Sequence, residues 1–452
     1  MSGSILWFRR DLRLADHPAL SVAAADGPVT PVFVLDPLFL SRSGPARLSF
    51  LLQGLAMLSR SMGGALVVRT GDPTVVVPSL AAEVGARAVH ASGDFGPYGR
   101  RRDDAVERAL AAEGRALVLT ASPYAVAPGQ VTKDDASPYA VFTPFSKAWR
   151  AVGWDRPLPE PDVAWRGPPT VPSEDLPAPP AVAADLPAAG EVAAHTRWEA
   201  FSVNALADYH EQRDRPGTPG TSVLSPYLRF GMIHPRQLLD GLGESQAHQV
   251  FASELAWRDF YAAVLFHNPR SAHENLNRRM AAMAVDTDAT ARNRFAAWAR
   301  GETGYPIVDA GMRQLLATGW MHNRVRMIAA SFLVKDLHLP WQWGARHFMV
   351  HLVDGDLASN SHGWQWTAGT GTDAAPYFRI FNPVSQSQRF DPDGHYIRHW
   401  VPSLSQVDGP EIHAPWLSKR GIPLGYQPPM VDHAHEREES LRRYGATRAA
   451  PG

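Results

Sequence analysis

The first part of the chain alternates short apolar, β-branched runs with segments of helical periodicity. Ile5–Phe8 and Val29–Leu35 have the length and composition of buried strands. Parallel strands need a long crossover, usually a helix, so this alternation predicts a parallel sheet covered by helices. We therefore expect an α/β, Rossmann-like domain over residues 1–130. Further strands are expected at Ala65–Arg69, Ala86–His90 and Ala116–Thr120, and helices at Pro45–Met62, Thr74–Val84 and Tyr98–Glu113.

The pattern changes after a segment crowded with proline and alanine. Pro157–Gly190 carries little periodic hydrophobicity, which is typical of an extended connection, and we place the interdomain linker at residues 131–195. Beyond it the apolar spacing is helical, so residues 196–452 are predicted to form an all-α domain that ends in a helix. The amphipathic segments are Trp198–Tyr209, Ser253–Phe266, Arg292–Ala299, Val308–Leu316 and Asn323–Leu337.

Composition excludes several classes of chemistry. The 452 residues include no cysteine, which removes disulfides, thiolate metal sites, iron–sulfur clusters and cysteine nucleophiles, so redox work needs a bound cofactor or aromatic side chains. No apolar run approaches a membrane span and the opening does not resemble a signal peptide, so we expect a cytoplasmic protein, and a monomer. A net charge of −1 means that a DNA partner would need a local basic surface.

The most unusual segment is Gly301–Pro383, which mixes indoles, arginines, carboxylates and amides. Such polar side chains are costly to bury unless a partner satisfies them. The plain alternative is a solvated pair of helices with a few core aromatics. His347 and His351 have the spacing of a zinc pair, but no HExxH pattern or suitable third ligand accompanies them, so we predict no metal site.

Three short patterns indicate a polar ligand. Thr221–Leu228 places small hydroxyls at an apparent helix start, which suits a phosphate, although a simple capped helix explains it as well. Asp356, Asn360 and Trp364 recur at helical spacing and indicate either a cation site or a heterocycle held by hydrogen bonds. In the third pattern, one helix face carries Glu254, Trp257, Arg258 and Tyr261. This face is either a functional surface or an intrahelical ion pair between Glu254 and Arg258 beside a core indole.

Longer motifs give a more specific indication. The chain contains GETGYPIVDAGMRQL, GWMHNRVRM, DGDLASN and GWQWTAGTGTDAAPYFRIFNP. Together these motifs resemble the photolyase and cryptochrome flavoprotein family, and most of all its class I cyclobutane pyrimidine dimer photolyases. The resemblance runs from the WFRRDLRLADHPAL opening to about Trp416.

The resemblance implies an α/β antenna-binding domain followed by a helical domain that binds FAD and DNA. It implies an enzyme, a carbon–carbon lyase that repairs cyclobutane pyrimidine dimers in UV-damaged DNA under blue light. In the implied reaction an electron passes from excited, reduced FAD to the dimer, the ring splits, and the electron returns. Photolyases are among the enzymes known to extrude their target base from the duplex.

The motifs also imply which residues hold FAD. One set holds the phosphates and ribityl chain, and the other surrounds the isoalloxazine and adenine. Asn360 falls where the family places the side chain nearest flavin N5, and Arg326 is expected to form a buried pair with Asp354. The first set is Tyr209, Thr221, Ser222, Leu224 and Ser225, and the second is Trp320, Asn323, Arg326, Asp354, Asp356 and Asn360.

By the same resemblance, an aromatic platform forms the substrate pocket. Stacking on indoles replaces what the dimer loses when it leaves the duplex. Glu254 is expected to hydrogen-bond the dimer carbonyls and to stabilise the charge that develops on them. The implied pocket residues are Glu254, Trp257, Asn323, Met327 and Trp366, with Arg213, Arg324 and Arg379 on the DNA phosphates.

The chain departs from the family pattern in its electron route. The family reduces its flavin through three tryptophans, and Trp364 and Trp341 match the inner two. The outermost position, ten residues before Trp298, is Asp288. We predict slower photoreduction, or a detour through another aromatic such as Trp298 or Trp343, with no effect on repair by flavin that is already reduced.

A second, antenna chromophore is expected in the N-terminal domain. The segment GDFGPYGRRRD lacks the Asn-Glu pair of folate-binding relatives, which favours 8-hydroxy-5-deazaflavin, with folate, FMN or an empty site as alternatives. The alternative function is a cryptochrome-type blue-light photoreceptor. A (6-4) photolyase is expected to have histidine in place of Asn323 and Met327, and a light-independent oxidoreductase is expected to have a nucleotide fingerprint, which this sequence lacks.

Overall fold

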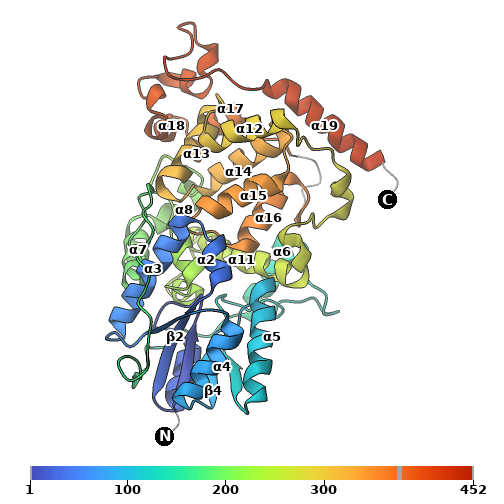
Figure 1. Cartoon of the computed structure of the whole chain (residues 1–452). Coiled ribbons are helices and arrows are strands. Elements are labelled where there is room, and N and C mark those ends of the chain that lie inside the picture. Colours follow the sequence, from blue (N-terminus) through green and yellow to red (C-terminus); the bar gives the residue numbers. More distant parts are fainter. Residues whose placement is uncertain (1–2, 374–378, 450–452) are drawn as a thin grey trace.

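The N-terminal part of the computed structural model is a parallel sheet (Figure 1), and the structure as a whole describes residues 3–373 and 379–449. The strands lie in the order β3-β2-β1-β4-β5, and every neighbouring pair is parallel. The predicted parallel α/β domain is therefore confirmed. The strands are β1 (Ser4–Phe8), β2 (Val29–Leu35), β3 (Val67–Thr70), β4 (Ala88–Ala91) and β5 (Ala116–Leu119).

Alternate residues of β1 pack into two different apolar clusters. Leu6 and Phe8 lie in a cluster with residues of α3, while Ile5 and Trp7 lie in another with residues of α4 and α5. Because both faces of the strand are covered, all of its residues are buried and the sequence is a continuous apolar run. The helices of this part are α1 (Pro18–Ala25), α2 (Pro37–Arg42), α3 (Pro45–Ser61), α4 (Pro73–Val84) and α5 (Pro97–Ala112).

The segment between the sheet and the helical half contains one helix, α6 (Phe142–Val152). This helix packs on the helical half, where the indole of Trp149 donates a hydrogen bond of 2.9 Å to Asp259. Residues 153–190 have no helix or strand of their own apart from one bridge between Trp165 and β2, as the proline-rich composition predicts. The expected linker therefore begins with a helix that belongs structurally to the part that follows.

The remainder is helical, which confirms the predicted second fold class (Figure 1). Helices α14, α15 and α16 lie side by side and bury one apolar cluster between them. The helices are α7 (Glu191–Asn204), α8 (Tyr209–Gln212), α9 (Ser225–Phe230), α10 (Pro235–Asp240), α11 (Gln246–His267), α12 (Ala289–Arg300), α13 (Pro306–Thr318), α14 (Asn323–Ser331), α15 (Trp341–His351), α16 (Leu357–Ala368), α17 (Pro383–Phe390), α18 (His395–Trp400) and α19 (His433–Ala449).

Two predicted helices are interrupted in the structure. The segment expected as a helix over Trp198–Tyr209 breaks after Asn204, before α8 begins. The segment expected over Asn323–Leu337 is α-helical only to Ser331 and continues as a π-helical turn, Phe332–Asp336. Within that turn the buried amino group of Lys335, whose pKa burial lowers well below its usual range, donates a hydrogen bond of 2.9 Å to the carbonyl of Ala368 at the end of α16. The apolar pattern of the segment gives no sign of this change of helix type.

The C-terminal helix α19 is held on this π-helical turn and the residues just after it by two histidine–carboxylate contacts. His338 contacts Glu436 at 2.7 Å, and His433 contacts Asp336. The predicted terminal helix is therefore confirmed, and it is docked rather than free (Figure 1).

Candidate functional site

A cavity of about 620 Å³ opens between α9, α11, α14 and α16. Small-molecule sites typically measure about 300–1,000 Å³. The helix face of α11 singled out in the sequence faces this cavity, so its interpretation as a functional surface is supported. The alternative ion pair with Glu254 is not formed, since Arg258 donates to the carbonyls of Pro123 at 2.9 Å and Leu228 at 3.1 Å. The four residues of that face are Glu254, Trp257, Arg258 and Tyr261.

Asp354 is the centre of a polar cradle on one side of the cavity. Its Oδ2 accepts hydrogen bonds from Ser225 Oγ at 2.6 Å and from Arg326 at 2.8 Å. The Trp320 indole donates 3.2 Å to the same Ser225 oxygen. Asp354 Oδ1 is buried and has no hydrogen-bond partner among the described residues, and the same holds for the indole N–H of Trp364. Unsatisfied buried groups of this kind fit a polar ligand that completes the site.

Asp356 connects the cavity to the N-terminal domain. Its side chain caps α16 by accepting from the N–H of Ser359 at 3.1 Å and pairs with Arg10 at 2.7 Å. Burial alone would raise the pKa of Asp356, but the charges of Arg10 and Arg229 outweigh it and hold the pKa well below its usual range. Burial and the nearby Arg10 lower the pKa of Arg229 to about 9. Asp356 is therefore ionised, which argues against a proton relay at this position. Because Arg10 already pairs with its negative charge, the structure does not support a cation site there either.

Glu254 has a partner that the sequence did not indicate. Arg213 donates to its Oε1 at 2.6 Å, although Arg213 was expected on a DNA phosphate. The pKa of Glu254 is raised above its usual range because burial outweighs the attraction of Arg213. Arg324, the second expected phosphate contact, pairs with Asp214 at 2.8 Å. Both arginines are therefore engaged by carboxylates in this structure, with only part of each guanidinium used.

The two indoles expected to form the aromatic platform, Trp257 and Trp366, are partly exposed, and together with Glu254 we call them the rim of the cavity. Trp257 and Trp366 both line it, and the guanidinium of Arg379 lies 5.7 Å from the ring centre of Trp366. The other face of Trp257 is covered by Phe142 of α6, with ring centroids 3.7 Å apart and an interplanar angle of 8°. Phe142 has no pattern in the sequence that marks it, because its contact is with a helix more than a hundred residues away.

Most of the expected site residues meet in this one cavity. Those that line it are Tyr209, Arg213, Ser222, Leu224, Ser225, Glu254, Trp257, Asn323, Arg324, Arg326, Met327, Asp354, Asp356, Asn360, Trp364, Trp366 and Arg379. Thr221, Trp320 and Trp341 do not line it. Asn360 donates its amide to the carbonyl of Ala345 at 2.9 Å, which leaves its oxygen toward other partners. Reasoning from the sequence missed Arg10, Arg229 and Phe142, although Arg10 lies in the opening motif that carries the resemblance.

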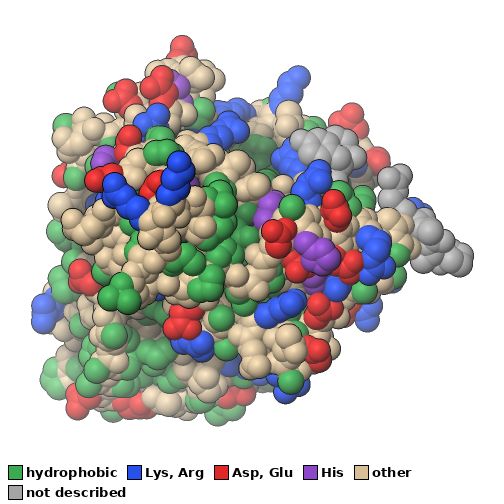
Figure 2. Space-filling view, turned by 90° about the horizontal axis from the view of Figure 1, so that it is seen from above, with side chains coloured by type: hydrophobic (Ala, Val, Ile, Leu, Met, Phe, Trp, Pro, Cys, Tyr) green, Lys and Arg blue, Asp and Glu red, His purple; other side chains and the backbone are tan. Residues whose placement is uncertain are grey.

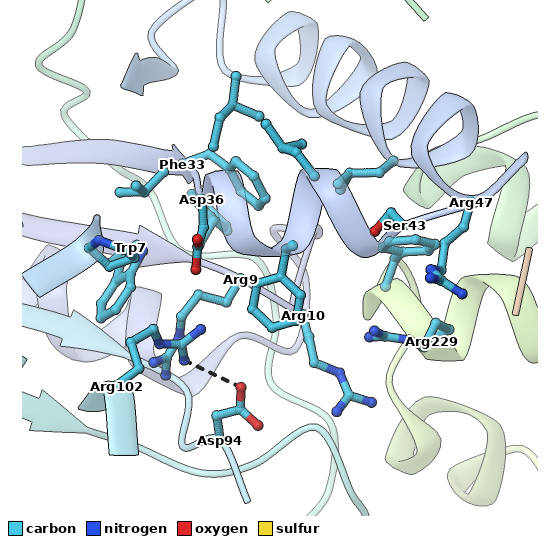
Figure 3. A pocket seen from close by; sticks show the side chains of 18 residues that line it. Trp7, Arg9, Arg10, Phe33, Asp36, Ser43, Arg47, Asp94, Arg102 and Arg229 are labelled. Carbon is cyan, nitrogen blue, oxygen red and sulfur yellow. Dashed lines mark hydrogen bonds and ion pairs between the residues drawn. The ribbon is translucent and has the colours of Figure 1, made fainter. Parts of the chain in front are cut away.

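A second cavity, of about 100 Å³, lies at the carboxyl ends of β1 and β2 (Figure 3). The guanidinium groups of Arg9 and Arg102 both lie against the Trp7 ring, 4.6 Å and 4.9 Å from its centre, and both pair with Asp103. Arg102 also pairs with Asp94 at 3.3 Å. Arg229 lines both cavities, so the two share a wall.

The aromatic residues around Trp364 form a connected path to a half-exposed indole. Trp298, which is fully buried, lies 6.1 Å from Trp364, and Phe295 stacks on Trp298 at 5.7 Å. Phe295 in turn meets the edge of Trp343 at 5.6 Å. Asp288 is the N-cap of α12, where its side chain accepts from Ala291 N–H at 2.7 Å.

Neither a metal-binding cluster nor a membrane-spanning helix is found among the described residues. No group of three or more His, Cys, Asp or Glu residues among them has the arrangement of a metal centre. None of the described helices is both long and apolar enough to cross a bilayer. On the face shown in Figure 2, acidic and basic side chains are interspersed rather than gathered by sign.

Comparisons with known proteins agree with this geometry. Residues 4–162 match the family model of DNA photolyase, and residues 251–446 match that of the FAD-binding domain of DNA photolyase. A deoxyribodipyrimidine photo-lyase of Vibrio cholerae is 38% identical over 97% of this chain and 98% of its own. A class III photolyase from Agrobacterium tumefaciens superimposes with a TM-score of 0.92 at 38% identity, covering 100% of this chain and 98% of that chain. A cryptochrome of Synechocystis has a TM-score of 0.89 at 30% identity, covering 97% and 98%.

The sheet, the helical half and the polar cavity therefore define a two-domain, FAD-binding protein. The chain belongs to the DNA photolyase family.

Proposed function

We propose that this protein repairs cyclobutane pyrimidine dimers in UV-damaged DNA under blue light, using FAD. The observation that carries the proposal is that one cavity holds both the polar cradle around Asp354 and the rim of Glu254, Trp257 and Trp366. A cofactor held by the cradle and a base held by the rim would therefore share one cavity. The homologous deoxyribodipyrimidine photo-lyases support the same reaction.

The cradle would hold FAD through Ser225, Arg326, Asp354, Asp356 and Asn360. Bound and reduced, FAD would supply an electron when excited by blue light. Asp354 and Arg326 fix each other at 2.8 Å, so the cradle is already organised before a ligand binds. Asn360 presents a neutral amide, which cannot readily protonate a neighbouring group.

Glu254 would act on the substrate. A carboxyl group can donate a hydrogen bond to a dimer carbonyl only when it carries its proton. Burial raises the pKa of Glu254 toward that state, while Arg213 opposes it. When DNA phosphate draws Arg213 away, the carboxyl is expected to gain its proton and donate to the carbonyl that accumulates negative charge.

The rim would hold the extruded dimer between indoles and arginines. Trp257 and Trp366 offer apolar surface, and Arg324 and Arg379 offer charge to the phosphates on either side. Because the net charge of the chain is −1, this local arrangement rather than overall attraction would direct DNA to the site.

The second cavity would hold the antenna chromophore. Its lining of Trp7, Phe33 and several arginines suits a planar, electron-rich ring system, and 8-hydroxy-5-deazaflavin remains the favoured occupant over folate and FMN. The cavity of about 100 Å³ is smaller than typical ligand sites, so the lining side chains must move to admit three fused rings. A solved archaeal photolyase of Sulfolobus tokodaii with two FAD molecules shows that relatives can carry two chromophores.

Blue-light signalling is the second candidate, since a cryptochrome is among the structural neighbours. The presence of Glu254 together with both indoles at the rim favours repair, because a photoreceptor has no need of a substrate pocket. Assignment to class I, a monomeric state and a cytoplasmic location remain predictions, and one solved neighbour is a class III photolyase.

One experiment separates repair from signalling. Purified protein with reduced FAD is incubated with an oligonucleotide that carries one thymine cyclobutane dimer, under blue light and in darkness. We expect the dimer to be restored to thymines only in the light, measured by chromatography of the oligonucleotide. An intact dimer after illumination of FAD-loaded protein would contradict repair and favour signalling.

A further inference from the structure

Phe142 is placed where it controls the orientation of Trp257. The two rings are nearly parallel, at 8° and 3.7 Å between centroids, while Trp257 also lines the cavity. Phe142 itself meets Phe260 at 5.8 Å, and Phe260 is fully buried in α11. One face of the Trp257 indole is therefore stacked on Phe142, which in turn packs on the buried Phe260. The rest of the indole surface is left to line the cavity.

The backbone at Phe142 is tied to the loop that follows α16. The N–H of Phe142 donates 3.2 Å to the carboxylate of Asp373, and the N–H of Asp373 donates 3.1 Å to the carbonyl of Ala140. Asp373 has a φ of 52°, in the left-handed region that a non-glycine residue adopts only when its surroundings hold it there. The start of α6 and this loop therefore hold each other in place across 231 positions of the chain.

We infer that Phe142 is a positioning residue for substrate recognition: it holds Trp257 at the angle that stacks on an extruded dimer. This inference rests on the proposed function and adds the interdomain segment to the substrate pocket. A side chain that is already held in its bound orientation loses less conformational freedom on binding, so affinity and selectivity rise without a new contact to the substrate. The effect should fall on dimer binding and not on the photochemical step.

The test compares dimer-containing and undamaged oligonucleotides in binding to FAD-loaded protein in darkness. We expect Phe142→Leu, which keeps an apolar side chain but removes the flat surface, to reduce the preference for the dimer by roughly 3- to 10-fold. Phe142→Tyr should keep the parent's preference for the dimer, because the aromatic ring is retained. Val152→Ala, on the exposed far end of the same helix, is the matched control and should bind as the parent does.

A double-mutant cycle separates positioning from general packing. If Phe142 acts through Trp257, Phe142→Leu should have no further effect on dimer preference in a Trp257→Ala background. FAD content and the repair rate at saturating DNA should stay unchanged in Phe142→Leu. Independent, additive effects of the two substitutions, or full dimer preference in Phe142→Leu, would overturn the inference. Parent protein with no preference for the dimer would instead contradict the proposed function and the inference together.

Discussion

Glu254 is a carboxyl on which two opposing influences act. Burial favours the protonated form, and Arg213, 2.6 Å away, favours the ionised form. A hydrogen bond donated to a developing negative charge needs the proton, so the first influence serves the proposed reaction. A carboxamide donates in the same direction at every pH.

We expect Glu254→Gln to keep most of the repair rate. Glu254→Ala should lower the repair rate roughly 5-fold, which is the effect on rate of losing one typical hydrogen bond. The parent should lose repair as pH rises and the carboxyl ionises, whereas Glu254→Gln should be independent of pH. Repair yield per absorbed light, measured between pH 6 and pH 9, checks both statements. A flat profile in the parent would show that the proton on Glu254 is not used.

At this scale the sequence predicted residue types well and partners poorly. Helical spacing placed Glu254 and Trp257 on the same functional face, and both line the cavity. It could not reveal the pairing of Glu254 with Arg213, because Arg213 follows the end of α8 and its approach depends on how α8 packs on α11.

Three helices, α12, α15 and α16, together place a chain of rings between the cavity and the surface. Trp364 on α16 contacts Trp298 on α12, and Phe295 links Trp298 to Trp343 on α15. At the position expected for the outermost tryptophan, Asp288 caps α12 and supplies no aromatic ring. The aromatic packing of these elements thus supports the predicted detour through Trp298 and Trp343.

We expect Trp343→Phe and Trp298→Phe each to slow photoreduction of bound FAD by an external thiol more than Trp341→Phe does. The reason is that each removes an oxidisable ring from the path, whereas phenylalanine conserves most of the packing. Loss of oxidised-flavin absorbance under blue light in the absence of oxygen is the measurement. Trp400→Phe, a substitution of a partly buried indole away from this path, is the control, and chemically reduced variants should repair normally. Normal photoreduction in Trp343→Phe would refute the detour.

Elements that repeat a simple period were predictable, and those shaped by distant contacts were not. All five strands of the sheet were found within a few residues of their predicted bounds. The clearest are β1 and β2, which are buried along their whole length and are almost entirely apolar. The π-helical turn after Ser331 and the packing of Phe142 on Trp257 both involve partners far along the chain, Ala368 in the first case and α11 in the second.

Across the whole molecule, burial keeps several imidazoles neutral. Burial lowers the pKa of four histidines to about 4, from an ordinary value of 6.5, and they are His234, His322, His347 and His362. Unfolded chains take up protons on these groups at a higher pH than the folded chain does, so their contribution to stability is present above pH 6.5 and is lost as pH falls toward 4. Carboxyl groups whose pKa burial raises act in the opposite sense over part of this range, among them Asp259 and Asp336 at about 6. Burial also lowers the pKa of further histidines, among them His90, His195 and His351, so the loss of stability toward low pH prevails.

We therefore expect the thermal midpoint of FAD-loaded protein to be lower at pH 5 than at pH 7. Scanning calorimetry at constant ionic strength measures it. Replacing one of the buried imidazoles that lines neither cavity, as in His234→Gln, should make the decline less steep. A midpoint that is constant or rises toward pH 5 would contradict the assignment of neutral imidazoles.

Arg229 stands in the wall common to both cavities, and Arg10 reaches from the N-terminal sheet to Asp356 beside the FAD cradle. Thermodynamic coupling between two binding sites is reciprocal. If the proposed antenna pigment binds in the smaller cavity, a change that it causes in the affinity for FAD would therefore equal the change that FAD causes in the affinity for the pigment.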